Sequence, residues 1–94
     1  ADGQQTTSPG VHTFEIMRHH VAEVATVTDA QILEAMDWLF HYQKQVVEPS
    51  GACALAALLC GEVQAVGQRV GVILSGGNVS LERFTELLQH RAAT

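Results

Sequence analysis

Two short segments of this 94-residue chain combine side chains that can do chemistry with glycines that let backbone approach a ligand. The first, Ser75-Gly76-Gly77-Asn78, follows an apolar run and precedes a helical pattern, which is where open parallel α/β sheets place ligand-contacting loops. Ser75 and Asn78 offer hydrogen bonds, while Gly76 and Gly77 allow a ring or a phosphate close to the chain. The same glycines also suit a tight strand-to-helix turn, so the segment alone leaves both interpretations open.

The second segment is Glu48-Pro49-Ser50-Gly51-Ala52, which places a carboxylate directly before an apolar helix. Helix N-termini stabilise negative charge through their free amides and dipole. Taken alone, Glu48 is therefore interpreted as a helix-capping acid, with ligand binding as the alternative.

The histidines and cysteines do not indicate a metal site or a nucleophile. The five histidines lack ligand spacing, and adjacent His19 and His20 point to different sides of a helix, so surface positions are expected. Cys53 and Cys60 lie seven positions apart in one predicted helix, about 10 Å along its axis, which is too far for a disulfide. Both are expected to be reduced, buried thiols, and burial should raise the pKa of Cys53.

Composition excludes some classes of function. Five basic residues against ten acidic ones give a net charge of −5, without the basic stripe that nucleic-acid binding needs. No apolar run approaches the roughly 20 residues of a membrane helix, and the first residues do not form a signal segment, so a soluble, cytoplasmic protein without membrane contacts is expected. A hydrophobic fraction of 47% with only 16% charged residues suits a buried portion of a larger protein.

Hydrophobic spacing predicts four helices and two strands. The helices are predicted at 14–22 with Thr13 as cap, at 29–44 after the capping box Thr28–Gln31, from Pro49 to a stop at Gly61, and from Ser80 to about Arg91. The strands are predicted at 24–27 and 70–74. The third helix is apolar on every face and the second strand is an unbroken apolar run, so both should be covered on all sides.

The order of the segments resembles the C-terminal part of the serine/threonine dehydratase and serine racemase family. The residues that carry the resemblance span almost the whole chain: Ala1-Asp2-Gly3, Thr26-Val27-Thr28-Asp29, Val47-Glu48-Pro49-Ser50-Gly51-Ala52 and Val72-Ile73-Leu74-Ser75-Gly76-Gly77-Asn78-Val79. The resemblance implies an α/β fold, a fragment of a parallel-sheet fold type II enzyme with helices packed around two short parallel strands. Residues 1–94 would be the C-terminal segment of a dehydratase-like catalytic domain.

Members of that family use pyridoxal 5'-phosphate, so the resemblance implies roles for particular residues. Ser75 would hydrogen-bond the pyridine nitrogen, and Gly3 would lie against the cofactor ring. Glu48 and Gly76 would also contribute to the cofactor site, whereas Thr6 would lie near the substrate carboxylate. Asn78 would shape the loop that carries Ser75.

The resemblance also implies that the chain alone is inactive. The Schiff-base lysine and the glycine-rich phosphate loop of the family lie upstream of the matched region, and the only lysine here, Lys44, is near the end of a helix. No catalytic residue is therefore assigned to this chain. The expected partners are the remaining N-terminal part of the enzyme, a small hydroxy amino acid and further copies in a homo-oligomer. The alternatives are an amino-acid racemase of the same family and a non-catalytic interaction module.

Overall fold

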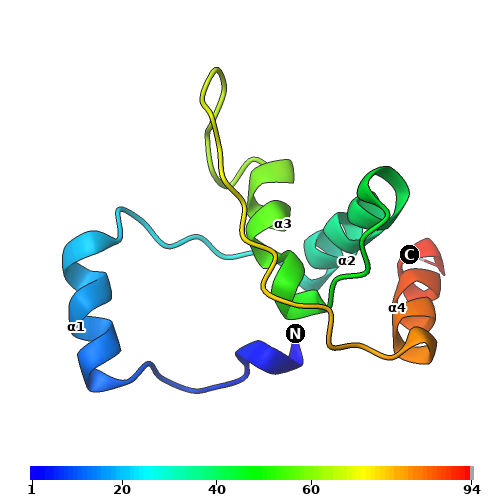
Figure 1. Cartoon of the computed structure of the whole chain (residues 1–94), viewed down its shortest axis with the longest axis horizontal. Helices are drawn as coiled ribbons and strands as arrows, with labels where there is room; N and C mark the ends of the chain where they lie inside the picture. Colours follow the sequence, from blue (N-terminus) through cyan, green and yellow to red (C-terminus); the bar gives the residue numbers. More distant parts are fainter. Residues whose placement is uncertain (94) are drawn as a thin grey trace.

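The computed structural model describes residues 1–93, and the side chains of residues 1–90. Its elements in chain order are η1 (Asp2–Gln4), α1 (Val11–His20), α2 (Asp29–Trp38), η2 (Leu39–Gln43), η3 (Pro49–Ala52), α3 (Cys53–Leu59) and α4 (Leu81–Ala93). Figure 1 shows α2 beside α3 and α4, with α1 standing apart at the end of two long connections.

The core lies where α2 meets α3, η3 and α4. One face of α2 supplies four of the ten buried residues described, and two of these, Ala35 and Met36, are completely shielded from solvent. Phe84 of α4 and Val47 cover the same cluster, whose buried members are Ile32, Leu33, Ala35, Met36, Leu39, Val47, Ala52, Leu55, Ala56 and Phe84. The helices that carry the candidate site are thus held by this chain's own side chains.

The start of α2 follows the sequence prediction. The Thr28 hydroxyl accepts a hydrogen bond from the Gln31 amide at 3.2 Å, and the Gln31 side chain accepts one from the Thr28 amide at 2.8 Å. This reciprocal pair is the predicted capping box, and it satisfies two amides that a helix start would otherwise leave unpaired. The helix continues through the wider π turn η2 and ends at Lys44, whose φ of 56° breaks the helical path.

The two later helices also begin and end near the predicted residues. Pro49 occupies the first turn of the 3-10 segment η3, which leads directly into α3. Gly61 follows α3 with a φ of 84°, a left-handed conformation that glycine adopts without a steric penalty. At α4, the Ser80 hydroxyl accepts a hydrogen bond from the Arg83 amide at 3.1 Å and so caps the helix.

The predicted α/β architecture is not confirmed, because residues 1–93 contain no strand. The segments 24–27 and 70–74, predicted to be short parallel strands with helices packed around them, are irregular connections. A strand requires a neighbour with which it exchanges backbone hydrogen bonds, and no such bond joins these two segments in the described part of the chain.

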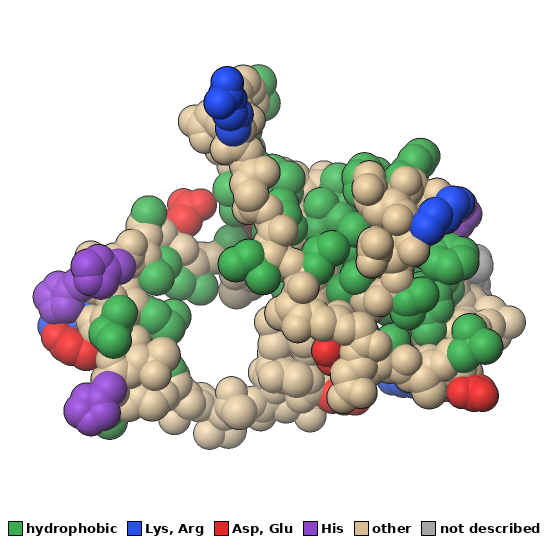
Figure 2. All heavy atoms as spheres, in the orientation of Figure 1, with side chains coloured by type: hydrophobic (Ala, Val, Ile, Leu, Met, Phe, Trp, Pro, Cys, Tyr) green, Lys and Arg blue, Asp and Glu red, His purple; other side chains and the backbone are tan. Residues whose placement is uncertain are grey.

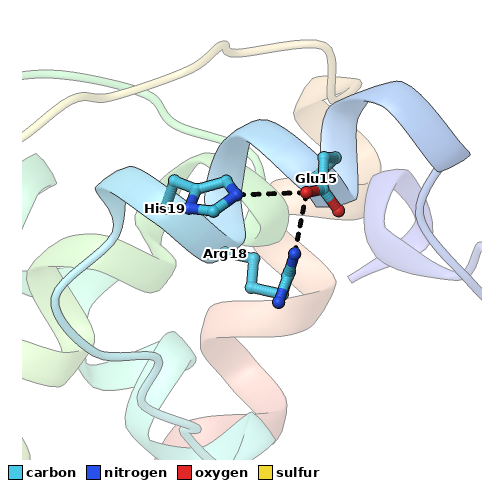
Figure 3. A network of polar contacts seen from close by, with 3 residues as sticks. All are labelled: Glu15, Arg18 and His19. Carbon is cyan, nitrogen blue, oxygen red and sulfur yellow. Dashed lines mark hydrogen bonds and ion pairs between the residues drawn. The ribbon is translucent and has the colours of Figure 1, made fainter.

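Helix α1 differs from its prediction in position and in packing. It begins after Gly10, three residues before the predicted start, and Thr13 is not its cap. It has no buried residue, although Phe14 and Ile16 are large and apolar. Its polar side carries a small network, in which the Glu15 carboxylate accepts bonds from Arg18 at 2.7 Å and contacts His19 at 3.1 Å (Figure 3). These two partners lower the pKa of Glu15.

The cysteines are free, as predicted, but only one is shielded. Cys53 is partly buried, and burial raises the pKa of its thiol. Cys60 is exposed, so the prediction of two buried thiols was wrong, because Cys60 follows the end of α3, where Leu59 is exposed as well. No helix in residues 1–93 combines the length and apolar content needed to span a lipid bilayer.

Candidate functional site

The two segments singled out from the sequence lie against each other. The Glu48 amide donates a hydrogen bond to the Gly76 carbonyl at 3.1 Å. A Cβ atom on Gly51 would lie 2.7 Å from that same carbonyl oxygen, and one on Gly77 would lie 2.6 Å from the Val46 carbonyl oxygen. Backbone therefore meets backbone along a line that we call the glycine seam, formed by residues 46–51 and 76–77.

The Glu48 side chain lies between two further glycine positions. A Cβ atom on Gly76 would be 2.9 Å from Oε1 of Glu48, and one on Gly3 would be 4.0 Å from Oε2. The Cβ position of Gly3 is also 2.9 Å from the Ser50 hydroxyl oxygen. Three of the four predicted cofactor residues, Gly3, Glu48 and Gly76, are therefore brought together. A Cβ atom at position 3 would crowd the Ser50 side chain, whereas one at position 76 would meet only the end of the Glu48 side chain.

The N-terminal turn η1 is connected to this cluster by a side-chain contact. The Cys53 thiol donates to the Gln4 side-chain oxygen at 3.0 Å, and η1 packs against η3. Cys53 thus helps to place Gly3 beside Glu48, a structural role that fits the pKa of its thiol, which burial raises.

A cavity of about 660 Å³ opens beside the cluster. Gly3 and Glu48 line one part of it, the start of α2 lines another, and Arg83 and His90 of α4 line a third. The predicted loop residue Asn78 lies at its edge. The cavity therefore joins the two conspicuous sequence segments to a helix for which the sequence indicated no ligand role.

The remaining predicted site residues are not held in the cluster by side-chain contacts. Ser75 precedes Gly76 directly, but its side chain is exposed and has no hydrogen bond among the described residues. Thr6 lies in the exposed connection between η1 and α1, also without a hydrogen bond in the described part of the chain. The structure places Ser75 next to the seam and leaves Thr6 outside it.

The sequence did not indicate Ser50 as a candidate site residue. Its hydroxyl oxygen is buried and has no hydrogen-bond partner among the described residues. The only available signal was its place in the segment Glu48–Ala52, where the charged residue drew the functional interpretation. Arg83 and His90 were missed for a similar reason, because their spacing on α4 is that of an ordinary solvated helix face.

Comparison with known proteins identifies the family. The family model described as "Pyridoxal-phosphate dependent enzyme" matches residues 1–76. L-threo-3-hydroxyaspartate ammonia-lyases are similar to 95% of this chain at 47% identity in a Pseudomonas species, and to 94% at 41% identity in Saccharomyces cerevisiae. A serine racemase of Schizosaccharomyces pombe is 36% identical over 94% of the chain. The chain spans only 27% or 28% of the length of these relatives. With its two glycine-bearing segments inside or overlapping the matched region, the chain belongs to the pyridoxal-phosphate-dependent enzyme family.

Proposed function

We propose that this chain is the C-terminal part of the catalytic domain of a pyridoxal-phosphate-dependent ammonia-lyase. The complete enzyme would convert a hydroxy amino acid into a 2-oxo acid and ammonia, and the chain alone would be inactive because the Schiff-base lysine lies upstream. The observation that carries the proposal is the convergence of Gly3, Glu48 and Gly76 in a chain of this family.

The residues at the seam fit an aromatic, polar cofactor. Gly3 and Gly76 place no side chain between the backbone and a bound ring. Glu48 and Ser50 add polar side-chain atoms that have no hydrogen-bond partners among the described residues. Ser75 extends from the adjoining residue with a free hydroxyl, suited to a hydrogen bond with a ring nitrogen. When bound, the cofactor would supply an electron-withdrawing ring that lets the substrate α-proton leave.

Each part of this chain would then have a limited task. The glycine seam holds Ser75 and Glu48 in fixed register, because backbone contacts rather than flexible side chains join their segments. The reaction breaks the Cα–H and Cβ–O bonds of the substrate and releases water, and hydrolysis of the resulting enamine yields the 2-oxo acid and ammonia. A neutral hydroxyl at Ser75 does not readily protonate the ring, which favours prompt elimination over transamination. Thr6 would contact the substrate carboxylate in the complete enzyme.

We infer a 3-hydroxyaspartate as the first substrate to test. Three relatives carry that activity in their names: the two ammonia-lyases above and a beta-hydroxyaspartate dehydratase of Paracoccus denitrificans, 41% identical over 77% of the chain. L-threonine dehydratases of Staphylococcus aureus are 36% identical over 96%. Threonine is therefore the second substrate to test.

The exposed apolar surface supports the proposal that other polypeptide covers this chain. Figure 2 shows hydrophobic side chains across the visible face, including α1, and an open gap between α1 and the rest of the chain. Val11, Phe14 and Ile16 are each more than half exposed, as is Ile73 in the predicted strand. Patches of this kind mark surfaces that other polypeptide covers. We propose the N-terminal part of the enzyme as that cover, in a homo-oligomeric, cytoplasmic protein.

The test is an assay of the complete enzyme with L-threo-3-hydroxyaspartate, L-threonine and L-serine. Ammonia and 2-oxo acid should form in equal amounts, and Ser75→Ala should lower turnover without changing the circular dichroism spectrum. Unchanged kinetics in that variant would remove the Ser75 assignment, and absence of both products would remove the ammonia-lyase assignment.

The similarity to a serine racemase supports the racemase alternative. Chiral chromatography of the L-serine reaction distinguishes the two, because D-serine without ammonia would identify a racemase. For the 94-residue chain alone, size-exclusion chromatography with circular dichroism tests the interaction-module alternative. Dimers or aggregates would support a fragment, whereas a cooperative monomer would support the module.

A further inference from the structure

An apolar groove lies on α4 and shares no lining residue with the cavity beside Gly3 and Glu48. It has a volume of about 340 Å³ and is lined by Phe40, Val46 and one face of α4. One lining residue, Phe84, is buried in the core, and its ring packs against the Phe40 ring at 5.6 Å between centroids. Other lining side chains are open to solvent: Phe40 is 42% exposed, Val46 45% and Leu81 74%.

The lining of the groove favours an apolar occupant. No lining residue is charged, and only Thr85 and Gln89 add polar side chains. A charged group placed there would lose water without gaining a partner, whereas an aliphatic or aromatic side chain would gain free energy on leaving water. Contiguous apolar surface of this kind marks a place where other polypeptide binds.

The relatives indicate where that polypeptide comes from. The similarity to the ammonia-lyases covers 94% or 95% of this chain and so extends into α4, but it spans only 27% or 28% of their length. In the complete enzyme proposed above, most of the polypeptide therefore lies outside this chain.

The size of the groove favours a segment of the same polypeptide over a second copy of the chain. The groove has seven lining residues, whereas a stable interface between separate proteins uses about 20–30 residues on each side. A covalently connected segment needs less contact area, because its connection to the rest of the enzyme raises its effective concentration.

The groove also adjoins the glycine seam through Val46. The Val46 side chain lines the groove, and the Val46 carbonyl oxygen would lie 2.6 Å from a Cβ atom on Gly77. An occupant that packs on Val46 therefore supports the backbone contact that holds the segment carrying Ser75.

We propose that this groove is the docking site for an apolar segment of the N-terminal part of the enzyme. The inference rests on the proposed function, in which this chain is the C-terminal part of a longer polypeptide. The segment places an aliphatic or aromatic side chain against Phe40, Val46 and Leu81, and it covers α4 on the side that the 94-residue chain leaves exposed.

The experiment measures thiol accessibility in the complete enzyme. Thr85→Cys places a thiol in the groove with little change in volume, and Leu81→Cys is a second probe in the same groove. Glu86→Cys is the matched control, because Glu86 is an exposed residue of α4 that lines none of the three cavities described. Each native variant is treated with iodoacetamide, the labelled peptide is quantified by mass spectrometry, and the rate is divided by that of the same variant unfolded in urea.

The normalised rates in Thr85→Cys and Leu81→Cys should be at least about tenfold lower than in Glu86→Cys, because a docked segment must open before the groove thiols react. The protection should persist when the enzyme is diluted until size-exclusion chromatography shows monomers.

Equal rates in the three variants would overturn the proposal, since the groove would then be no better covered than the outer face of α4. Protection that disappears in diluted monomers would also overturn it and would identify a second copy as the occupant. Thiol labelling does not depend on activity, so the two proposals fail separately. Protected thiols in an enzyme that forms neither ammonia nor 2-oxo acid would remove the ammonia-lyase assignment and keep the docking site.

Discussion

Two regions of this molecule have similarly apolar sequences and very different packing. The packed region consists of α2, η2, η3, α3 and α4, and it contains every buried hydrophobic residue described except Val47, which adjoins it. The outer region consists of residues 5–27 and 60–74, and none of its residues is buried. It nevertheless includes Phe14, Ile16 and Ile73, all more than half exposed.

The comparison shows which parts of the chain supply their own partners. In the packed region, α2 is covered by η3 and α3, which follow it, and by α4 near the other end of the chain. In the outer region, α1 has no buried residue, and Val27 and Val72 of the predicted strands are only partly buried against the core. Hydrophobic sequence alone does not produce a core, because the complementary surface must also be present.

The largest expected effect is the loss of packing at Met36, the largest side chain that is fully buried. Met36→Ala should lower the free energy of unfolding by about 2–5 kcal/mol. Met17→Ala in α1 is the control and should change it by less than about 0.5 kcal/mol. Urea unfolding of the 94-residue chain, followed by circular dichroism, measures both. Equal effects would mean that the two regions do not differ in packing.

The glycine seam should be the next most sensitive feature. Gly51→Ala places a methyl group against the Gly76 carbonyl and a Val47 methyl, neither of which moves easily. We expect a loss of about 1–3 kcal/mol in unfolding free energy. Gly71→Ala in the outer region meets nothing within 4 Å and serves as the control. A tolerated Gly51→Ala would show that the seam is looser than its contacts indicate.

A smaller effect is expected at the cap of α2. Thr28→Ala removes the acceptor for the Gln31 amide and should cost about 1 kcal/mol. Thr28→Ser keeps the hydroxyl and should restore most of that loss. Thermal unfolding of the three proteins side by side is sufficient, and identical midpoints for all three would rule out the capping contribution.

The smallest effect concerns Glu15 on the exposed side of α1. Because Arg18 and His19 lower its pKa in the folded chain, the ionised carboxylate favours the helix. That contribution is complete above the usual carboxyl pKa and is lost as the pH falls through the lowered value. The helical circular dichroism signal should therefore decrease slightly more in wild type than in Glu15→Gln on acidification. Identical acid titrations would mean that the network in Figure 3 does not support α1.

Sequence patterns correctly predicted the helix boundaries that depend on local signals. They did not correctly predict the strands, which depend on a neighbouring strand. The capping box at Thr28, the proline at the start of η3 and the glycine after α3 are local signals, and all three were confirmed. The strands at 24–27 and 70–74 depend on neighbours in space, and no neighbouring strand is present among the described residues.

The candidate site shows the same division. The two motifs were recognisable from residue type and spacing, and their resemblance to a known family indicated which residues to compare. The contact of Glu48 with Gly76 and the unpaired Ser50 hydroxyl arise only when distant segments meet. Residue spacing along the chain does not determine such contacts.

The glycine seam also affects which parts of the chain can change in length. The seam holds the chain together on both sides of the segment 52–75. The far end of that segment can therefore change length without disturbing the Glu48 carboxylate beside Gly3. Doubling a flexible loop costs only about 0.6 kcal/mol in closure entropy. Insertions around Gly67 should thus be a cheap route to new surface features, while the neighbouring chemistry stays the same.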